Sequence, residues 1–283
     1  MPVKIYAHRG SSARFAEHTR AAYVQALADG ADGVECDLQL SADGVLVLVH
    51  DEEVDRTSNG TGKVAGLTLA QLKSLDFSSW KGAQIPAESG GVGEQFLTLS
   101  ELIDILASAT RPIGLAIELK YGAVFDPALV DATLAALASR GWSAQTSTLE
   151  NVRVSFMSFH PEAVAYLAQQ IPAERLCQLL EDERVSTQPA SGGPAEHELL
   201  ALLRMAREVA EKLLDDGLAH IVGPSVEYVR ANQKNIARWR AAGHTFRVWT
   251  VDSGADLELC LATGMEEVTT NRPADIKALL ADA

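Results

Sequence analysis

Short apolar segments alternate with helical patterns along this chain, and that alternation restricts its fold more than any other feature. Helical spacing of apolar residues follows several strand-like segments, as at 98–109, 126–139 and 161–170. Such alternation is typical of a parallel sheet covered by helices. The strand-like segments are 3–7, 33–40, 45–50, 113–120, 152–159, 175–181, 220–225, 245–252 and 266–271.

The number of strand-like segments favours a closed barrel. Asp43-Gly44 lies between two alternating apolar runs, which predicts that 33–40 and 45–50 form a hairpin. With the hairpin included, the nine segments exceed the eight strands of a barrel by one, so either the hairpin replaces one βα unit or one segment is misassigned. The alternative is an open doubly wound sheet, but no GxGxxG motif follows the first strand-like segment. We therefore expect an α/β fold of the (β/α)8 TIM barrel type, with reactive residues at the carboxyl ends of its strands.

Residues 51 to about 97 interrupt the alternation. This segment is rich in Gly, Ser and Thr, and its one short helical stretch begins after Thr68, a suitable N-cap. A connection of this length is usually functional or an inserted subdomain. We expect residues 1–283 to form a single barrel domain with an inserted subdomain at about 51–97, and a polar loop at 182–196.

Composition argues against several classes of protein. The net charge of −14 disfavours nucleic acid as a partner, because phosphate backbones select basic surfaces. Cys36, Cys177 and Cys260 form no CxxC pair, which predicts buried thiols in a reducing compartment. The N-terminus lacks the apolar core of a signal peptide, and no apolar run approaches the roughly 18 residues of a membrane span. We expect a cytoplasmic protein without stable membrane insertion, and no sequence feature indicates its oligomeric state.

Three acidic residues lie near the ends of two strand-like segments. Glu35 and Asp37 share a face because side chains on a strand alternate with a period of two, and Glu118 offers a third acid on a later strand. Facing the barrel interior, they would repel one another unless a cation lies between them. The alternative is that they lie at the rim and pair with surface bases. As ligands they suit one divalent cation, Mg²⁺ or Ca²⁺, rather than zinc.

Two histidines and two cationic residues lie close to these acids in the sequence. His8 and His50 are candidates for acid–base catalysis because an imidazole titrates near neutral pH. Arg9 is a candidate for bidentate phosphate binding, with an ordinary surface arginine as the alternative. Lys120 either pairs with Glu118 or binds a substrate oxygen. Together these groups suggest metal-assisted chemistry on a phosphate ester.

The other candidate positions are less specific. Trp249 either forms an apolar wall for an alcohol moiety or fills the barrel core. Structural roles are assigned to the remaining histidines, which are His18, His160, His197, His220 and His244.

The motifs of the chain resemble those of the glycerophosphodiester phosphodiesterase family. The resemblance covers nearly the whole length, and the segment from 33 to 64 is its most specific part. The matching motifs are HRG at 8–10, E-x-T at 17–19, GVECDLQLSADGVLVLVHD at 33–51, DRTSNGTGKV at 55–64, TLAQLKSLDFSSW at 68–80, LTLSELIDIL at 97–106, IELK at 117–120, SFHPEAV at 158–164, VWTVD at 248–252 and TNRP at 270–273.

The resemblance implies a (β/α)8 barrel with a small insertion and metal-dependent hydrolysis of glycerophosphodiesters to sn-glycerol 3-phosphate and an alcohol. It implies that Glu17 and Asp51 support the site from nearby positions. Carried over residue by residue, it assigns metal binding to Glu35, Asp37 and Glu118, acid–base catalysis to His8 and His50, and substrate binding to Arg9, Lys120 and Trp249.

The chain departs from the family pattern at three places. His18 stands where the family usually has the Asn of Pro-Glu-Asn-Thr, and this change is expected to alter hydrogen bonding around the site or the substrate mouth. Asp252 takes the place of the Asn that often ends Trp-Thr-Val-Asn. Asn271 takes the place of the Asp in Thr-Asp-x-Pro.

Two alternatives to this function remain open. One is a phosphodiesterase of the lysophospholipase D type, and the other is a protein that binds phosphate esters without catalysis. Within the favoured function, the nucleophile is either water or the neighbouring glycerol hydroxyl of the substrate, which would form a cyclic phosphate.

Overall fold

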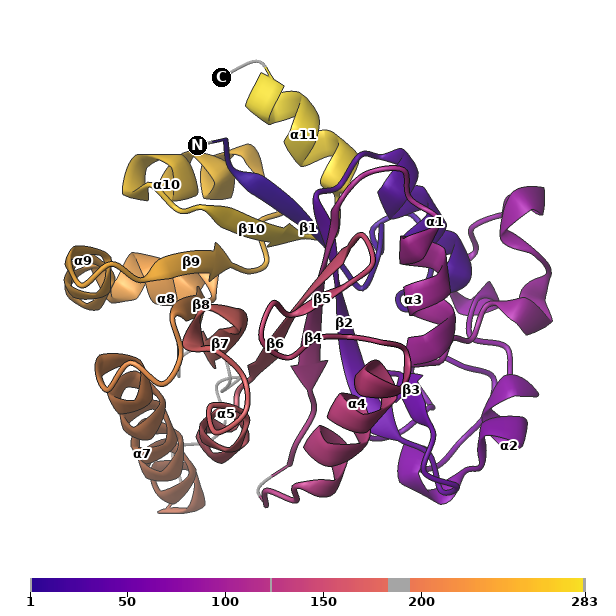
Figure 1. The fold of residues 1–283 in the computed structure, drawn as a ribbon, viewed down its shortest axis with the longest axis horizontal. Helices are drawn as coiled ribbons and strands as arrows, with labels where there is room; N and C mark the ends of the chain where they lie inside the picture. The colour runs from indigo at the N-terminus through magenta and orange to yellow at the C-terminus, as the bar shows by residue number, and fades with distance from the viewer. Residues whose placement is uncertain (1, 123, 183–193, 282–283) are drawn as a thin grey trace.

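The architecture is a closed barrel of parallel strands surrounded by helices (Figure 1). The computed structural model describes residues 2–122, 124–182 and 194–281. Within these residues, β1 pairs with both β2 and β10, and this pairing closes the ring. The predicted (β/α)8 barrel is therefore confirmed. Its strands are β1 (Lys4–His8), β2 (Gly33–Leu40), β4 (Ile113–Leu119), β6 (Val152–Ser158), β7 (Leu176–Leu180), β8 (Ile221–Pro224), β9 (Thr245–Val248) and β10 (Glu267–Thr270).

The predicted hairpin lies beside the barrel. β3 (Leu46–Leu48) runs antiparallel to the end of β2, and Gly44 adopts a φ of +76° in the turn between them, where glycine carries no steric penalty. The Asp43 carboxylate accepts a hydrogen bond from the backbone N–H of Leu69, which ties the hairpin to the following segment. The short strand β5 (Thr148–Leu149), which the sequence patterns do not predict, pairs with β6.

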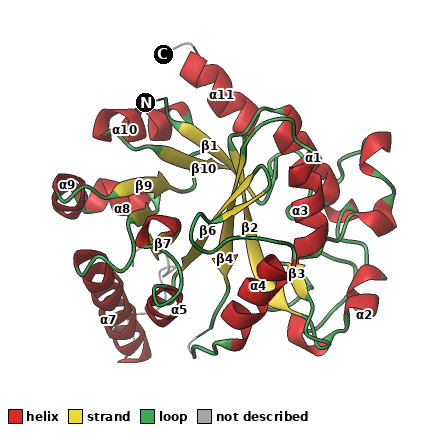
Figure 2. Cartoon of the chain, viewed as in Figure 1, coloured by secondary structure: helices red, strands yellow, loops and turns green. Residues whose placement is uncertain are grey.

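Helices lie on the outside of the strands (Figure 2). Capping explains several of their starting points, because Thr68 and Thr98 each accept a hydrogen bond from the backbone three residues on, in reciprocal capping boxes with Gln71 and Glu101. The α-helices are α1 (Arg20–Ala28), α2 (Leu69–Lys73), α3 (Leu99–Ala107), α4 (Ala128–Ser139), α5 (Pro161–Leu167), α7 (Pro194–Asp215), α8 (Val226–Ala231), α9 (Gln233–Ala241), α10 (Gly254–Thr263) and α11 (Pro273–Ala281).

One predicted helix is divided in two. The sequence suggests a continuous helix over 229–243, but Asn232 has φ −122° and ψ 40°, outside the helical region, and separates α8 from α9. Both its backbone N–H and its side-chain amide donate to the Tyr228 carbonyl, so the asparagine caps the end of α8. The predicted loop at 182–196 lies mostly outside the described residues, and α7 already begins at Pro194.

The segment after the hairpin forms a layer against β3. It contains α2 and four short 3₁₀ turns, and its apolar side chains cluster with Val47 and Val49 of the hairpin, separately from the main core. The cluster consists of Val47, Val49, Val54, Val64, Leu72, Phe77 and Phe96. The 3₁₀ turns are Val64–Gly66, Ser79–Lys81, Ala87–Ser89 and Val92–Glu94, with a further one at Ala173–Arg175 before β7. The division into one domain with an inserted subdomain stays a prediction.

The lower part of the barrel interior is filled by an aromatic and ionic cluster. The Arg247 guanidinium lies 4.2 Å from the centre of the Tyr6 ring and 2.7 Å from the Glu267 carboxylate. A Cβ at Gly33 or Gly114 would come within 2.5 Å of the Tyr6 side chain, so this ring requires glycine on β2 and on β4. Tyr6 and Arg247 are both buried, so this part of the barrel is filled by side chains, as is usual in this fold.

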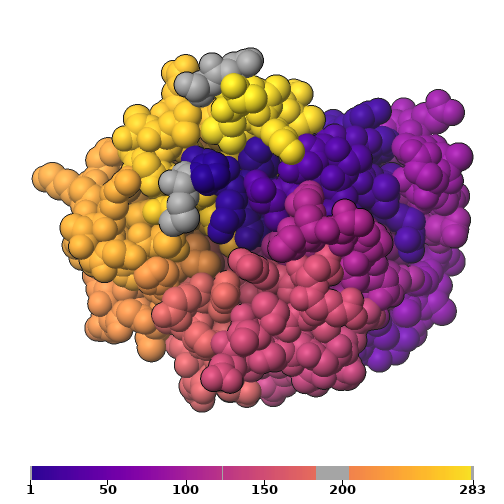
Figure 3. All heavy atoms as spheres, turned by 45° about the horizontal axis from the view of Figure 1, so that its top comes forward, coloured from indigo at the N-terminus to yellow at the C-terminus, as the bar shows by residue number. Residues whose placement is uncertain are grey.

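The first strand and the last helix of the described residues are neighbours. β1 pairs with β10, so the first strand and the last helix lie side by side, as the space-filling view shows (Figure 3). Among the described residues, no helix has both the length and the apolar character needed to cross a membrane.

Candidate active site

The turn after β1 aims its backbone at the acidic residues. Arg9 has a φ of +57° and Gly10 a φ of +82°. A Cβ on Gly10 would lie 2.6 Å from the backbone carbonyl carbon of Ala22, so the turn requires glycine there. The left-handed conformation of Arg9 is unusual for a residue with a side chain. Its backbone N–H donates a hydrogen bond of 3.0 Å to Glu35, which stabilises this conformation.

Strand register brings the three predicted carboxylates together. His8 is paired with Glu35 across β1 and β2, and Asp37 is paired with Glu118 across β2 and β4. One oxygen from each of Glu35, Asp37 and Glu118 lies within 4.8 Å of the other two, and all three side chains are buried. The rim alternative is thereby excluded, since two of these acids have no exposed surface.

The acidic cluster fits a divalent cation. Oε1 of Glu35 and Oδ1 of Asp37 are buried and accept no hydrogen bond from the described residues, which is costly for a carboxylate without a metal. Burial and the Asp37 charge raise the pKa of Glu35 well above its usual range. Burial also raises the pKa of Glu118, to about 7, against the opposing charge of Lys120. A hard cation with oxygen ligands, such as Mg²⁺ or Ca²⁺, would relieve this repulsion.

Asp37 is the carboxylate with the most cationic surroundings. Nζ of Lys120 lies 3.6 Å from Oδ1 of Asp37 and 2.7 Å from Glu118, and Nε of Arg9 lies 3.1 Å from Oδ2 of Asp37. Burial raises the pKa of Asp37, but Lys120, His18 and Arg9 outweigh it and hold that pKa well below its usual range. Both cations predicted to contact the substrate therefore already face the carboxylates.

His8 is held by an amide. Its Nδ1 lies 2.8 Å from Oδ1 of Asn271, and Nδ2 of the same amide donates to Asp252 at 2.5 Å. Since the bond to Asp252 fixes which end of the amide is the oxygen, Nδ1 of His8 carries the proton and Nε2 is left as the base, 4.0 Å from Glu35. Burial, together with the Arg9 charge, lowers the pKa of His8 to about 4, so the imidazole is neutral at neutral pH.

His50 is held by a carboxylate. Its Nδ1 lies 2.6 Å from Oδ1 of Asp51, which assigns the proton to Nδ1 and leaves Nε2 for reaction. Burial lowers the pKa of His50, while the charge of Asp37 opposes that shift, so the hairpin has brought these two residues within electrostatic reach. Glu17 and Asp51, predicted to support the site, both contact Arg56.

Trp249 has features of both predicted roles, the core residue and the apolar wall. Its ring packs with the small apolar cluster of the barrel interior, its Nε1 donates to the Gly223 carbonyl at 2.9 Å, and its ring centre lies 5.4 Å from that of the half-exposed Phe159. It therefore fills the upper core and also contributes to an aromatic surface at the mouth.

Four residues at the site carry roles that the sequence patterns do not assign. His18 is given a structural role from the sequence, with an expected effect on hydrogen bonding around the site, and its Nε2 lies 2.9 Å from Asp37 and its Nδ1 2.9 Å from the Tyr23 hydroxyl. Asn271 and Asp252 are noted only as departures from the family pattern, and Arg56 only as part of a motif. Position within matching motifs is the one signal that points to them.

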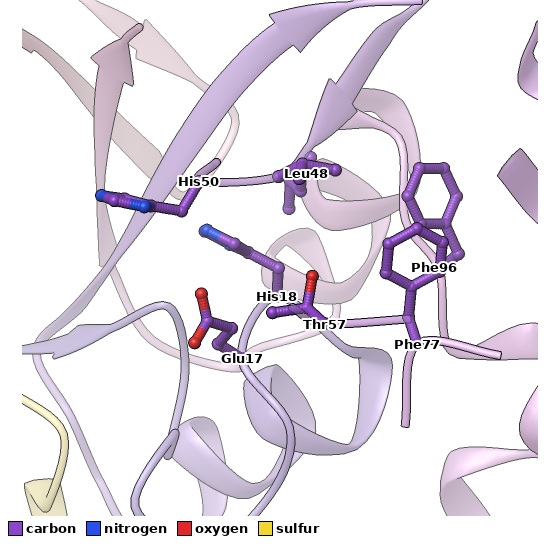
Figure 4. Close-up of a pocket in the computed structure, with 8 residues that line it drawn as sticks. Glu17, His18, Leu48, His50, Thr57, Phe77 and Phe96 are labelled. Carbon is purple, nitrogen blue, oxygen red and sulfur yellow. The ribbon is translucent and has the colours of Figure 1, made fainter. Parts of the chain in front are cut away.

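A small pocket separates the polar site from the apolar cluster of segment 51–97. Glu17, His18 and His50 line one side of it, and Phe77 and Phe96 line the other, as Figure 4 shows. The two phenylalanine rings pack at a tilt of 37°, with their centres 4.5 Å apart. The histidine and glutamate side chains thus face buried apolar side chains across the pocket.

The residues of the candidate site all lie within a region that matches a known protein family. The model of the glycerophosphoryl diester phosphodiesterase family matches residues 8–275. The chain belongs to this family. It is similar to a probable glycerophosphodiester phosphodiesterase 1 of Mycobacterium tuberculosis, with 34% identity over 98% of this chain and 92% of that protein. It is similar to a glycerophosphodiester phosphodiesterase of Bacillus subtilis, with 30% identity over 94% of this chain and 83% of the other.

Solved structures confirm the fold. A phosphodiesterase of Oleispira antarctica, determined in complex with the product sn-glycerol-3-phosphate, has a TM-score of 0.72 at 24% identity, covering 100% of this chain and 98% of that one. A glycerophosphodiester phosphodiesterase of Agrobacterium tumefaciens has a TM-score of 0.65 at 26% identity, with 99% of each chain covered. The predicted family, the barrel and the enzyme class, a phosphodiesterase, are therefore confirmed.

Proposed function

We propose that this enzyme hydrolyses glycerophosphodiesters to sn-glycerol 3-phosphate and an alcohol, with one divalent cation, Mg²⁺ or Ca²⁺, bound by Glu35, Asp37 and Glu118. The observation that carries the proposal is the meeting of three buried carboxylates with two histidines whose Nε2 atoms are unprotonated. The names of the relatives support the substrate class. On this proposal the enzyme binds a small-molecule glycerophosphodiester and does not bind nucleic acid. The cytoplasmic location also stays a prediction.

The side chains divide the chemistry among them. A bound cation would supply Lewis acidity and offset the charge of the phosphate oxygens. Lys120 and Arg9 add positive charge at the same place, where preorganised donors stabilise the transition state. Nε2 of one histidine takes the proton of the nucleophile, and Nε2 of the other, once protonated, gives one to the leaving alkoxide. Trp249 provides an apolar surface for the carbon atoms of the substrate.

The test is release of glycerol 3-phosphate from glycerophosphocholine by the purified protein, after chelation and after return of Mg²⁺ or Ca²⁺. We expect activity only with the cation. Undiminished activity after exhaustive chelation would contradict the metal role. Turnover of lysophosphatidylcholine in preference to glycerophosphocholine would instead favour the lysophospholipase D alternative, and tight binding without turnover would favour a binding protein.

Metal binding is tested separately by calorimetry. Asp37→Asn removes one charged ligand and is expected to weaken cation binding at least about tenfold, because hard divalent cations depend on carboxylate charge. Glu258→Gln is the matched control, since Glu258 is an exposed carboxylate on α10. Equal cation affinity in the Asp37 variant and the control would exclude the proposed ligand set.

A further inference from the structure

Arg56 lies between two carboxylates that belong to different parts of the chain. Its Nε and Nη2 contact Asp51 at 2.5 and 3.2 Å, and its Nη1 and Nη2 contact Glu17 at 2.9 and 2.7 Å. Each carboxylate therefore receives two N–H groups from one guanidinium. This paired geometry uses the planar fork of arginine, which a lysine ammonium cannot reproduce.

Each of the two carboxylates holds one residue of the proposed site. Oδ1 of Asp51 accepts from Nδ1 of His50 at 2.6 Å, and Oε1 of Glu17 accepts from Nη1 of Arg9 at 3.0 Å. Without Arg56, Asp51 and Glu17 would be two anions held near each other, and like charges repel. Arg56 thus joins His50 and Arg9 through two hydrogen-bonded paths.

Buried neighbours and backbone hydrogen bonds hold the backbone around Arg56. Val54 and Thr57 are buried on either side of it, and Val54 packs into the apolar cluster of segment 51–97. The Thr57 N–H donates to the Val54 carbonyl, and the Val54 N–H donates to Gly62, which closes a turn. Arg56 is nevertheless 46% exposed at its side chain, so a buried turn presents a half-exposed guanidinium.

We propose that Arg56 is a positioning residue that holds His50 through Asp51 and Arg9 through Glu17, and so gives segment 51–97 a part in the reaction. This inference rests on the proposed function. Arg56 itself is not assigned a contact with the substrate or with a transferred proton. It acts by limiting the orientations of the His50 imidazole and the Arg9 guanidinium through the two carboxylates that they contact.

Steady-state kinetics provide the first test. We expect Arg56→Ala to lower kcat about 10²-fold with KM changed far less, because small displacements of a reacting group have effects of this size. Arg56→Lys keeps the charge but loses the fork, and we expect it to recover only part of that loss. The matched control is Arg230→Ala, because Arg230 is 50% exposed and also pairs with two carboxylates, Asp256 and Glu227, with no catalytic candidate attached.

The outcomes separate positioning from other roles. A rise in KM with kcat unchanged would make Arg56 a substrate contact, and wild-type kinetics in both variants would show that it positions nothing; either result overturns the proposal. If Arg56→Ala does not fold, Arg56→Lys answers the same question, since it preserves the ionic attraction. Circular dichroism and a thermal unfolding curve for each variant establish which case applies.

The tautomer of His50 provides a readout that does not depend on turnover. Imidazole ¹⁵N shifts are expected to show the proton on Nδ1 in the wild-type protein and in Arg230→Ala, and a mixture of the two tautomers in Arg56→Ala. An unchanged tautomer in Arg56→Ala would contradict positioning through Asp51. If the wild-type protein hydrolyses no glycerophosphodiester, the proposed function fails, while the ¹⁵N measurement still decides whether Arg56 orders His50.

Discussion

The two candidate catalytic histidines are held in the same tautomer by opposite means. His8, at the end of β1, faces the neutral amide of Asn271, and the carboxylate of Asp252 lies behind that amide. His50, after the hairpin, faces the carboxylate of Asp51, and the cation Arg56 lies behind it. In both cases the proton is on Nδ1 and Nε2 is available. We call these sets the His8 arm and the His50 arm.

Burial explains the difference between the arms. Nε2 of His8 lies 4.0 Å from Glu35 inside the barrel, where a further carboxylate in direct contact would add to a cluster that is already repulsive. An amide fixes the tautomer there without adding charge. The side chain of His50 is 33% exposed, so a carboxylate costs less, and Arg56 neutralises it. The comparison teaches that the same proton position can be set by either partner, according to the surrounding charge.

The largest effect is expected from removing either histidine. His8→Ala and His50→Ala should each lower kcat by about 10²–10⁴-fold, the usual contribution of a general acid or base. Turnover of glycerophosphocholine measures this loss. If one of the two variants retained near wild-type turnover, only the other arm would be catalytic and the comparison would no longer hold.

The second largest loss of kcat is expected from changing the charges of Asn271 and Asp252 in the His8 arm. Asn271→Asp alone would place a second carboxylate against Asp252, where Asn271 Nδ2 now lies 2.5 Å from Oδ2, and two such groups cannot both ionise. We expect a loss in kcat of about 10- to 100-fold, the range found for residues that orient a reactive group. Asp252→Asn in the same chain removes the clash and should restore most activity. If the double variant did not recover, activity would depend on having the neutral amide, and not the carboxylate, next to His8.

A pH-dependent effect is expected at the junction of the His50 arm with Arg9. Burial raises the pKa of Glu17, but Arg56 and Arg9 outweigh it and lower that pKa to about 2. A depressed carboxylate pKa stabilises the folded state above the unfolded value, near 4.5, and this contribution is lost as the pH falls toward 2. Its size at neutral pH is about 3 kcal/mol.

Urea unfolding of Glu17→Gln tests that contribution. The variant should be less stable than the wild-type protein at about pH 6, and the difference should shrink as the pH is lowered toward about pH 3. His50 should keep its bond to Asp51 in this variant, because Arg56 still contacts that carboxylate. A stability difference that does not change with pH would show that Glu17 acts by packing and not by charge.

The smallest effect is expected from a hydroxyl at the edge of the His8 arm. Ser12 Oγ lies 2.7 Å from both Oδ1 of Asn271 and the His8 carbonyl, and its single proton can serve one of them at a time. Ser12→Ala should cost about 1 kcal/mol of stability, the net value of one hydrogen bond, with kcat reduced less than about tenfold. A loss as large as that of His8→Ala would place Ser12 among the reacting groups.

Local patterns accounted for most of the elements. The Asp43-Gly44 turn, the Thr68 cap and the strand-like segments were all recognisable because each depends on neighbours within a few residues. The break at Asn232 was not recognisable, because the apolar spacing continues through it. The three acids were also predictable, since two share a strand face and the third ends another strand.

The partners of the histidines could not be read in the same way. Asn271 is 263 residues from His8, and Arg56 is 39 residues from Glu17, so neither contact leaves a periodic pattern. The sequence marked His18 as a departure from the family motif but could not name its partner, and in the structure its backbone is left-handed, with φ +61°, and its Nε2 contacts Asp37. Such contacts depend on how the turns between elements meet.

The sequence by itself determined the barrel, the family and the set of candidate site residues, because strand and helix periodicity, turn chemistry and residue type are properties of short segments. Only the tertiary structure decided how those groups are held. Closure of β1 on β10 brings Asn271 to His8, and the packing of segment 51–97 against the hairpin brings Arg56 to Glu17 and Asp51. The physical reason is that charge and hydrogen bonding act through space, between residues that chain connectivity leaves far apart.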